Sequence, residues 1–259
     1  MRPEHPIGVF DSGVGGLSIL RALRAELPHE DFVYFSDAAH APYGEKGDDY
    51  VCDRSLAIAL DMLEQHRVKS LVVACNTATA AAVHLLRERH AELPTVGVEP
   101  ALKPAAALTR TGRVAVFATR GTLASAKFAR LHDSLRHRAE FILQPCDGLA
   151  AAIEAGDAVR VQSLCERYVA QAGRFGTAPG EIDTLVLGCT HYPFAEAVLR
   201  ALVGPAVRFV ETGEPVARQT HRLLETRGLL NPSGRGHTEW LTSGEPLALQ
   251  TAAGRWLGS

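Results

Sequence analysis

Two cysteines in matching sequence surroundings are the residues of this chain best suited to do chemistry. Residues 69–82 read KSLVVACNTATAAA and residues 182–194 read IDTLVLGCTHYPF, so Cys75 and Cys189 each follow an apolar, strand-like run. Each cysteine precedes residues that suit the first turn of a helix, and a helix N-terminus favours the thiolate form. Two such thiols facing each other across one pocket could move protons to and from both sides of a small molecule.

Three interpretations of this cysteine pair compete. A disulfide requires the two Cβ atoms to lie within about 4.5 Å. A zinc site could use Cys75, Cys189, His191 and Asp11, but these residues lack the CxxC or HxxxH spacing typical of zinc ligands. The third interpretation places a substrate carbon about 3–3.5 Å from each sulfur, with the sulfurs roughly 6–7 Å apart. We favour the third, because the elements flanking both cysteines suit the carboxylate of an amino acid.

A glycine-rich loop carries an acid at the end of the first expected strand. Asp11 opens the run DSGVGG at 11–16, whose glycines permit close backbone approach and whose N–H groups could hold a carboxylate or phosphate. The glycine spacing differs from the dinucleotide fingerprint, and no Lys-Ser/Thr pair follows as in a P-loop. An acid here can bind a substrate ammonium or orient a base; the alternative is a simple helix cap.

Apolar runs typical of buried strands alternate with longer Ala/Leu-rich segments. The expected strands span 7–10, 32–35, 71–74, 95–98, 114–118, 141–143, 185–187 and 207–210, with a further strand near Trp240. The expected helices span 16–27, 48–65, 77–89, 123–135, 157–171 and 194–202. This alternation predicts an α/β protein whose mainly parallel sheets are covered by helices on both faces.

An internal echo predicts two similar units. The run IGVFDSGVGGLSIL near the start resembles RVAVFATRGTLASAKF at 113–128, and each precedes one of the cysteine segments. We therefore expect two pseudo-symmetric three-layer α/β domains, the first formed by 1–98 with 208–259 and the second by 99–207. Because ligands of open parallel sheets bind beyond the carboxyl ends of the strands, the active site is expected at the interdomain cleft.

Composition limits the classes of function. The 259-residue chain has a formal net charge of −2 at pH 7 and scattered basic residues, which argues against nucleic acid or an anionic membrane as a partner. No apolar stretch is long enough to span a bilayer, and the first expected strand begins too early for a signal peptide to precede it. The odd count of five cysteines favours a reducing compartment, so we expect a cytoplasmic protein. Cys52 and Cys165 are expected to be packing residues, and Cys146 begins a loop.

Six short motifs occur in a characteristic order and cover most of the chain. They are FDSGVGG at 10–16, APYG at 41–44, VVACNTAT at 72–79, VEP at 98–100, ATRGTLAS at 118–125 and LVLGCTHYPF at 185–194. Together they resemble the glutamate racemases of the cofactor-independent aspartate/glutamate racemase family, and the paired CNT and GCTHYP segments are highly specific. The resemblance implies an amino-acid racemase, using neither cofactor nor metal, that interconverts L- and D-glutamate and supplies D-glutamate for peptidoglycan.

The resemblance also implies roles for individual residues. Cys75 and Cys189 would be the two acid/base residues, each serving one enantiomer, and Asp11 and His191 would assist the thiols as hydrogen-bonding or proton-relaying partners. Glu154, by spacing alone an ordinary helix-end carboxylate, lies where the family has a helper glutamate. The substrate would be bound by Asp11, Ser12, Tyr43, Gly44, Asn76, Thr77, Thr190 and His191.

The chain departs from the family pattern in a loop that flanks the expected site. Ser36-Asp37 stands where Gly-Asp is usual, and Glu45-Lys46-Gly47 differs from the usual run after PYG. These departures concern the shape of the loop and the kinetics more than the type of reaction.

Several alternatives stay open at this stage. An aspartate racemase or a related two-cysteine isomerase fits the same residues, because one methylene of substrate length leaves no mark on these motifs. A dithiol redox or zinc protein and a non-catalytic amino-acid binding module belong to other classes. The expected partner is a small-molecule substrate, and a homodimer is compatible with the sequence.

Overall fold

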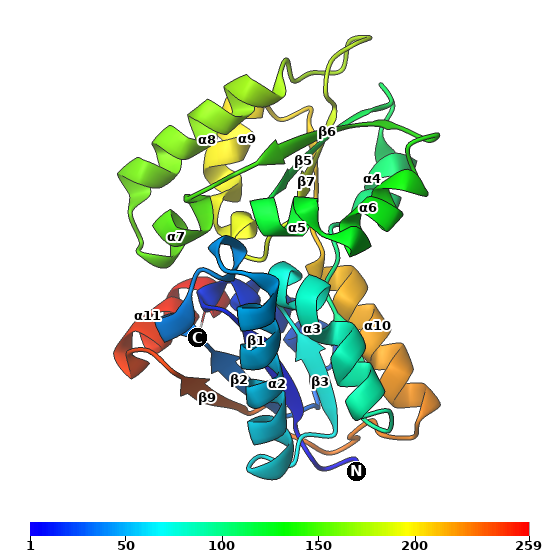
Figure 1. The fold of residues 1–259 in the computed structure, drawn as a ribbon, viewed down its shortest axis with the longest axis vertical. Helices are drawn as coiled ribbons and strands as arrows, with labels where there is room; N and C mark the ends of the chain where they lie inside the picture. Colours follow the sequence, from blue (N-terminus) through cyan, green and yellow to red (C-terminus); the bar gives the residue numbers. More distant parts are fainter. Residues whose placement is uncertain (259) are drawn as a thin grey trace. The chain divides into compact units, whose positions relative to one another are not determined.

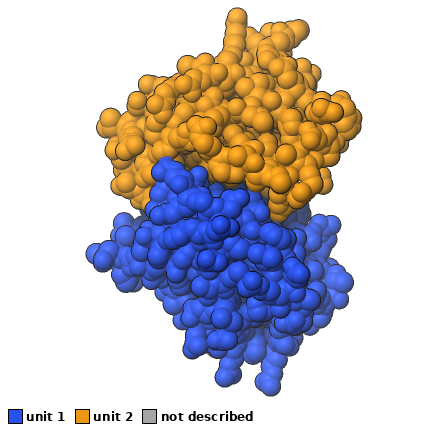
Figure 2. All heavy atoms as spheres, viewed as in Figure 1, with its two compact units in different colours: residues 1–98, 213–259 blue, residues 99–212 orange. Residues whose placement is uncertain are grey.

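The computed structural model describes residues 1–258, which form two compact units (Figure 2). Unit 1 comprises Met1–Val98 and the chain from Gly213 onward, and unit 2 comprises Glu99–Thr212. Each unit is built around its own parallel sheet. No helix within residues 1–258 is both long enough and apolar enough to cross a membrane.

The sheet of unit 1 has five strands, all parallel, in the order β4-β3-β1-β2-β9 (Figure 1). The strands are β1 (Ile7–Asp11), β2 (Phe32–Ser36), β3 (Ser70–Val73), β4 (Thr95–Gly97) and β9 (Thr238–Thr242). The register pairs Asp11 with Ser36 and Phe10 with Val73, so the carboxyl ends of β1, β2 and β3 lie at one edge. Residues that follow these three strands are therefore brought close together.

Helices cover both faces of this sheet. They are α1 (Leu17–Glu26), α2 (Asp48–Glu64), α3 (Asn76–Arg89), α10 (Gly213–Thr226) and α11 (Pro246–Leu257). Helices α2 and α3 pack against each other and share a core with Phe10 and Val33, whereas α1 packs against α10 and α11. Side chains alternate along a strand, and Val9 and Tyr34, which point away from that core, are also completely buried. Burial of both faces explains why these strands read as continuous apolar runs.

Unit 2 repeats this architecture around a four-stranded parallel sheet in the order β6-β5-β7-β8. Its strands are β5 (Arg113–Ala118), β6 (Glu140–Pro145), β7 (Thr184–Leu187) and β8 (Arg208–Val210). Its helices are α4 (Leu102–Leu108), α5 (Arg120–Ala124), α6 (Ala126–Asp133), α7 (Leu149–Glu154), α8 (Ala158–Ala172) and α9 (Glu196–Val203). One face packs Phe117 and Leu185 against α7, α8 and α9, and the other packs Val114 and Val116 against α4 and α6.

The two units share one strand order. Taken in chain order, β1 to β4 and β5 to β8 are arranged as second-first-third-fourth in their respective sheets. The predicted fold class of two pseudo-symmetric α/β domains with parallel sheets is confirmed, and the further strand near Trp240 is β9. The internal echo in the sequence therefore corresponds to a repeated topology.

Two local expectations are corrected by the structure. The single helix expected over 123–135 is two helices, because Ser125 has an extended backbone and its Oγ accepts the Phe128 N–H at 3.1 Å, which caps α6. The second unit boundary falls at 212/213 rather than 207/208. The reason is that β8 pairs with β7 and is therefore part of the sheet of unit 2.

Candidate active site

The two cysteines occupy equivalent positions in the two units. Cys75 lies two residues beyond β3 and Cys189 two residues beyond β7, and these strands hold the same place in their sheets. The two residues are 5% and 7% exposed, respectively. None of the five cysteines, all within the described residues, forms a disulfide. Each unit therefore presents one shielded thiol at the carboxyl edge of its sheet.

Cys75 is the N-cap of α3. Its backbone is extended, and its Sγ accepts a hydrogen bond from the Ala78 N–H at 3.5 Å. The thiol donates to Ser12 Oγ at 3.8 Å, and the Ser12 hydroxyl donates to Asp11 Oδ1 at 3.2 Å. A helix N-terminus stabilises negative charge, so this position suits a thiolate. The contacts also link the sulfur to a carboxylate through one hydroxyl.

Asp11 is the last residue of β1 and is completely buried. Its Oδ1 also accepts the Ser12 N–H at 2.6 Å. A Cβ on Gly16 would lie 2.7 Å from the Asp11 Cβ and 2.8 Å from the Tyr34 hydroxyl. Glycine at this position therefore lets the turn before α1 pass directly over the carboxylate, which explains one glycine of the DSGVGG run. The structure brings Asp11 and Ser12 to Cys75.

Asn76 and Thr77 begin α3 directly after Cys75 and are buried, at 4% and 7% exposure. Within residues 1–258, neither Oδ1 nor Nδ2 of Asn76 has a hydrogen-bond partner. Leaving a buried polar group unsatisfied costs about 1–3 kcal/mol. A ligand that hydrogen-bonds this amide would remove the cost, so the Asn76 amide is available to a ligand next to Cys75.

Tyr43 and Gly44 lie in the short 3₁₀ helix η3 (Tyr43–Glu45), in the loop that follows β2. Tyr43 is 1% exposed, and its hydroxyl donates to Asp37 Oδ2 at 2.5 Å. Its ring belongs to the same buried cluster as Cys75. Burial raises the pKa of Tyr43, and the hydrogen bond to Asp37 and the charges of Asp37 and Cys75 raise it further. The Tyr43 phenol therefore stays protonated, and its hydrogen bond to Asp37 holds the loop after β2 in place.

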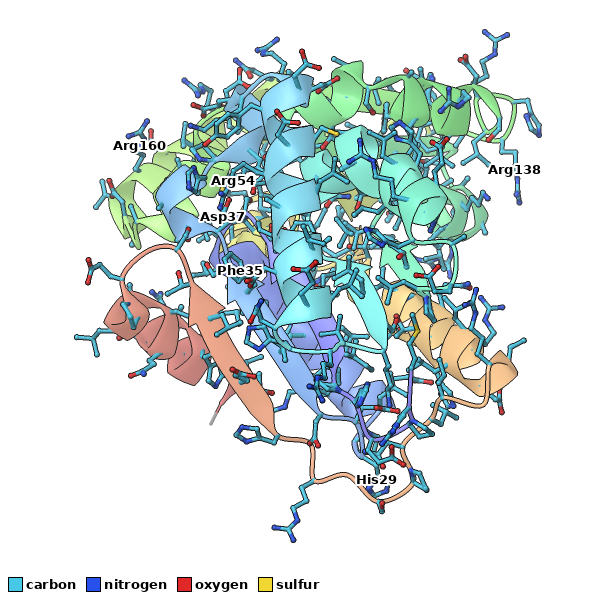
Figure 3. The ribbon with its side chains drawn as sticks, turned by 60° about the horizontal axis from the view of Figure 1, so that its bottom comes forward. His29, Phe35, Asp37, Arg54, Arg138 and Arg160 are labelled. Carbon is cyan, nitrogen blue, oxygen red and sulfur yellow. The ribbon has the colours of Figure 1, made fainter. Side chains whose placement is uncertain are left out.

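The sequence motifs did not single out the ion pair behind Tyr43. Arg54 on α2 donates from Nη2 to Asp37 Oδ1 at 2.6 Å and from Nε to Oδ2 at 3.1 Å. Figure 3 shows Arg54 and Asp37 side by side, beyond Phe35 at the end of β2. Asp37 stood out in the sequence only as part of the Ser36-Asp37 departure from the family pattern, and a single arginine on an amphipathic helix gave no signal.

Cys189 in unit 2 has a different set of neighbours. Its Sγ lies 3.8 Å from His191 Nδ1, and His191 Nε2 lies 2.6 Å from Glu154 Oε2. Glu154 is the last residue of α7, 37 positions from the histidine along the chain. Thr190, between the cysteine and the histidine, is also buried. The structure thus brings Cys189, Thr190, His191 and Glu154 together.

His191 is 5% exposed, and its environment favours the charged form. Burial by itself lowers the pKa of His191, but the hydrogen bonds to Cys189 and Glu154 and their charges raise it well above its ordinary value. An imidazolium between the sulfur and the carboxylate places a positive charge beside Cys189.

The residues around Cys75 and those around Cys189, called here the two half-sites, differ because the first strand of each unit ends in a different residue. The registers Phe10–Val73 in unit 1 and Phe117–Leu187 in unit 2 make Ala118 the counterpart of Asp11. Alanine offers no acid or base, so the ionisable groups behind Cys189 come from His191 and α7 instead.

The other cysteines of unit 2 are buried near Cys189 in the same core cluster. Burial raises the pKa of Cys146 well above its ordinary value and that of Cys165 to about 11, so both remain thiols near neutral pH. The carbonyl of Cys146 accepts a hydrogen bond from the Tyr192 hydroxyl at 3.3 Å. These contacts are those of packing residues. Among residues 1–258, no group of three or more His, Cys, Asp or Glu side chains is arranged to hold a metal ion.

Comparison with known proteins gives a consistent result. The sequence model described as Asp/Glu/hydantoin racemase matches residues 17–220. The chain is 49% identical over 243 residues to the glutamate racemase of Pseudomonas paraeruginosa, covering 93% of this chain and 89% of that protein. It is similar to the crystal structure of a glutamate racemase isoform from Bacillus anthracis, with a TM-score of 0.86, 30% identity and coverage of 100% and 96% of the two chains. It is also similar to the Francisella tularensis glutamate racemase in complex with D-glutamate, with a TM-score of 0.82, 28% identity and coverage of 99% and 95%.

Proposed function

The chain belongs to the Asp/Glu/hydantoin racemase family, and from this premise we propose that it interconverts L- and D-glutamate by a two-thiol mechanism without a cofactor. The observation that carries the mechanism is the equivalent placement of Cys75 and Cys189, neither in a disulfide and each two residues beyond the third strand of its unit. The curated relatives are named glutamate racemases, and a similar structure holds D-glutamate, which supports glutamate as the substrate.

The proposed reaction moves one proton off the Cα of glutamate and another onto it. One cysteine, as the thiolate, takes the Cα proton from one face, and the electron pair stays on the carbon. The other cysteine, as the thiol, gives its proton to the opposite face, so the product is the mirror image and the two sulfurs have exchanged protonation states. In the reverse direction their roles swap. We propose that the carbon lies between the two sulfurs, as the sequence predicts.

Each thiol has a route by which its proton can be exchanged. On the Cys75 side the Ser12 hydroxyl and the Asp11 carboxylate continue the chain of hydrogen bonds. On the Cys189 side the His191 imidazole and Glu154 do so. We propose that the His191 cation holds the thiolate form of Cys189, and that both sets of groups reset the two cysteines between turnovers.

The Cα–H of an amino acid is a very weak acid, so the charge that develops on the carbon must be stabilised. Preorganised dipoles in a site shielded from water supply such stabilisation. We propose that Asn76, Thr77 and Thr190, at the starts of helical segments, bind the α-carboxylate into which the charge spreads. The buried, unpartnered amide of Asn76 supports this role. Asp11 would bind the ammonium group, with Ser12, Tyr43, Gly44 and His191 completing the substrate contacts.

We further propose that the reaction takes place in the cytoplasm and supplies D-glutamate for peptidoglycan, as the family resemblance implies.

The two-thiol mechanism is tested with Cys75→Ser and Cys189→Ser, using Cys52→Ser on α2 as the matched control. A serine hydroxyl is a far weaker acid than a thiol, so the racemisation rate of each active-site variant should be about 10²- to 10⁴-fold lower than that of the wild type. The wild type should incorporate deuterium at Cα in D₂O, and Cys52→Ser should behave like the wild type. Full activity in either active-site variant would refute the two-thiol mechanism. Faster turnover of aspartate than of glutamate by the wild type would reassign the substrate.

A further inference from the structure

Asp37 connects four segments of unit 1. Its buried carboxylate accepts hydrogen bonds from Arg54 on α2, from Tyr43 in η3 and from Ser243 after β9. Its own N–H donates to the Asp11 carbonyl at 2.9 Å, at the end of β1. The residue therefore fixes the start of the loop after β2 relative to both the sheet and α2.

Arg54 provides the positive charge that faces this carboxylate. The Asp37 side chain has 0% exposure and that of Arg54 29%, and the two share a bidentate pair of hydrogen bonds. Burial by itself raises the pKa of Asp37, but the hydrogen bonds from Arg54, Tyr43 and Ser243 and the charge of Arg54 bring it below its ordinary value. Removing one partner of a buried ion pair leaves an uncompensated charge, so Asp37 depends on Arg54 to stay ionised and in place.

The loop continues this connection to the first half-site. The Tyr43 hydroxyl binds Asp37, while its ring packs in the buried cluster that contains Cys75 and Ala78 of α3. The Tyr43 carbonyl accepts the Lys46 N–H at 3.0 Å, which closes the turn around Gly44. A shift of Asp37 would therefore move both Tyr43 and Gly44 relative to the sulfur.

We propose that Arg54 is a positioning residue of the racemase: by fixing Asp37, it holds Tyr43 and Gly44 at the distance from Cys75 at which they bind the substrate. Arg54 acts through Asp37 and contacts no reacting atom. This inference rests on the proposed function and assigns to that site a residue on α2 that no motif of the sequence marks.

Two variants at Arg54 separate positioning from general destabilisation. Arg54→Gln removes the charge, and Arg54→Lys keeps the charge but cannot form the bidentate pair. Arg113→Gln is the matched control, because Arg113 forms a bidentate pair with Glu140 at the start of β5 in unit 2. Because Tyr43 and Gly44 are proposed to bind the substrate and not to react with it, we expect a rise in KM for both glutamate enantiomers of about tenfold or more in Arg54→Gln, with a smaller change in kcat. Arg54→Lys should lie between Arg54→Gln and the wild type.

Hydrogen–deuterium exchange gives a second readout that does not require activity. The His40 N–H is bound by the Asp37 carbonyl and the Lys46 N–H by the Tyr43 carbonyl, so amides of residues 38–46 should exchange faster in Arg54→Gln and as in the wild type in Arg113→Gln. Wild-type exchange and a wild-type KM in Arg54→Gln would overturn the inference, as would a loss of kcat at unchanged KM. If Arg54→Gln fails to fold, the same two measurements on Arg54→Lys decide. A wild type that does not racemise glutamate would refute the proposed function, while the exchange data would still test the role of Arg54.

Discussion

The charge behind His191 can be removed with little change of shape by Glu154→Gln. Glu154 Oε2 lies 2.6 Å from His191 Nε2, and the two side chains are 21% and 6% exposed, so the contact is only weakly screened. Hydrogen bonds to charged groups contribute about 1.5–3 kcal/mol, against about 1 kcal/mol for neutral ones. The difference of about 1–2 kcal/mol, roughly tenfold in an equilibrium constant, favours the imidazolium of His191 in the wild type and is lost in the variant. We therefore expect kcat/KM to fall about tenfold.

The pH dependence of this variant follows from the direction of the shift. The pKa of His191 is raised in the folded protein, so the imidazolium is present below that pKa and is lost as pH rises through it. Glu154→Gln lowers this pKa, so the alkaline limb of kcat/KM should move to lower pH. The variant should therefore approach wild-type activity on the acidic side and lose most activity on the alkaline side.

Kinetic isotope effects assign the defect to one thiol. The two enantiomers have equal free energies in water, so kcat/KM must fall by the same factor in both directions. With substrate deuterated at Cα, however, slowing proton abstraction by Cys189 should raise the isotope effect for one enantiomer only. Glu196→Gln on α9 is the control, because it also removes a carboxylate paired with a cation, Arg200. An unchanged alkaline limb together with unchanged isotope effects would refute the role of Glu154.

Two further substitutions test the scaffold that holds the half-sites. Asp183→Asn should lower the free energy of unfolding by about 1–3 kcal/mol at pH 7, because the buried carboxylate accepts hydrogen bonds from two backbone N–H groups and two threonine hydroxyls. Burial by itself raises the pKa of Asp183, but these hydrogen bonds bring it below its ordinary value. The wild type should therefore lose this stability as pH falls below about 4. In denaturant titrations, the unfolding free energy of the variant should change less over this pH range than that of the wild type. Gly97→Ala places a Cβ 2.6 Å from Thr79 Cγ2 and should cost about 1–3 kcal/mol, because Thr79 Oγ1 is held by the Val73 carbonyl and the Val98 N–H. An unchanged melting temperature in Gly97→Ala would show that Thr79 can move freely.

The order of the elements could be predicted from the sequence because the signals that set it are local. Buried parallel strands read as apolar runs, and the residues after each run suit a turn or helix start. Non-local pairing leaves no such mark. The edge strand β8 has only three residues, two of them half-buried, and only its pairing with β7 shows that it belongs to unit 2. Likewise, the apolar pattern continues across Ser125, so the break between α5 and α6 appears only in the backbone.

The same distinction separates the site residues that the sequence suggested from those it missed. Asp11 ends strand β1 and Ser12 follows it, and β1 is adjacent to β3, the strand that leads to Cys75, so their proximity to Cys75 follows from parallel pairing alone. Glu154 emerged only through the family resemblance, because 37 residues separate it from His191. Arg54 gave no signal, because an arginine on a surface helix most commonly faces solvent.

The repeated topology accounts for the equivalent positions of the two thiols but not for the different groups beside them. In the proposed mechanism each thiol needs an ionisable neighbour to change its protonation state, and in unit 1 the last residue of β1, Asp11, would supply one through Ser12. In unit 2 the corresponding residue is Ala118, so the end of β5 provides no ionisable side chain. There His191, paired with Glu154, would meet that need as a cation next to the sulfur, in place of an acid. A racemase must deprotonate either enantiomer. With opposite charges beside the two thiols, proton abstraction by Cys75 and proton abstraction by Cys189 would depend differently on pH. The isotope effects measured for Glu154→Gln distinguish these two steps.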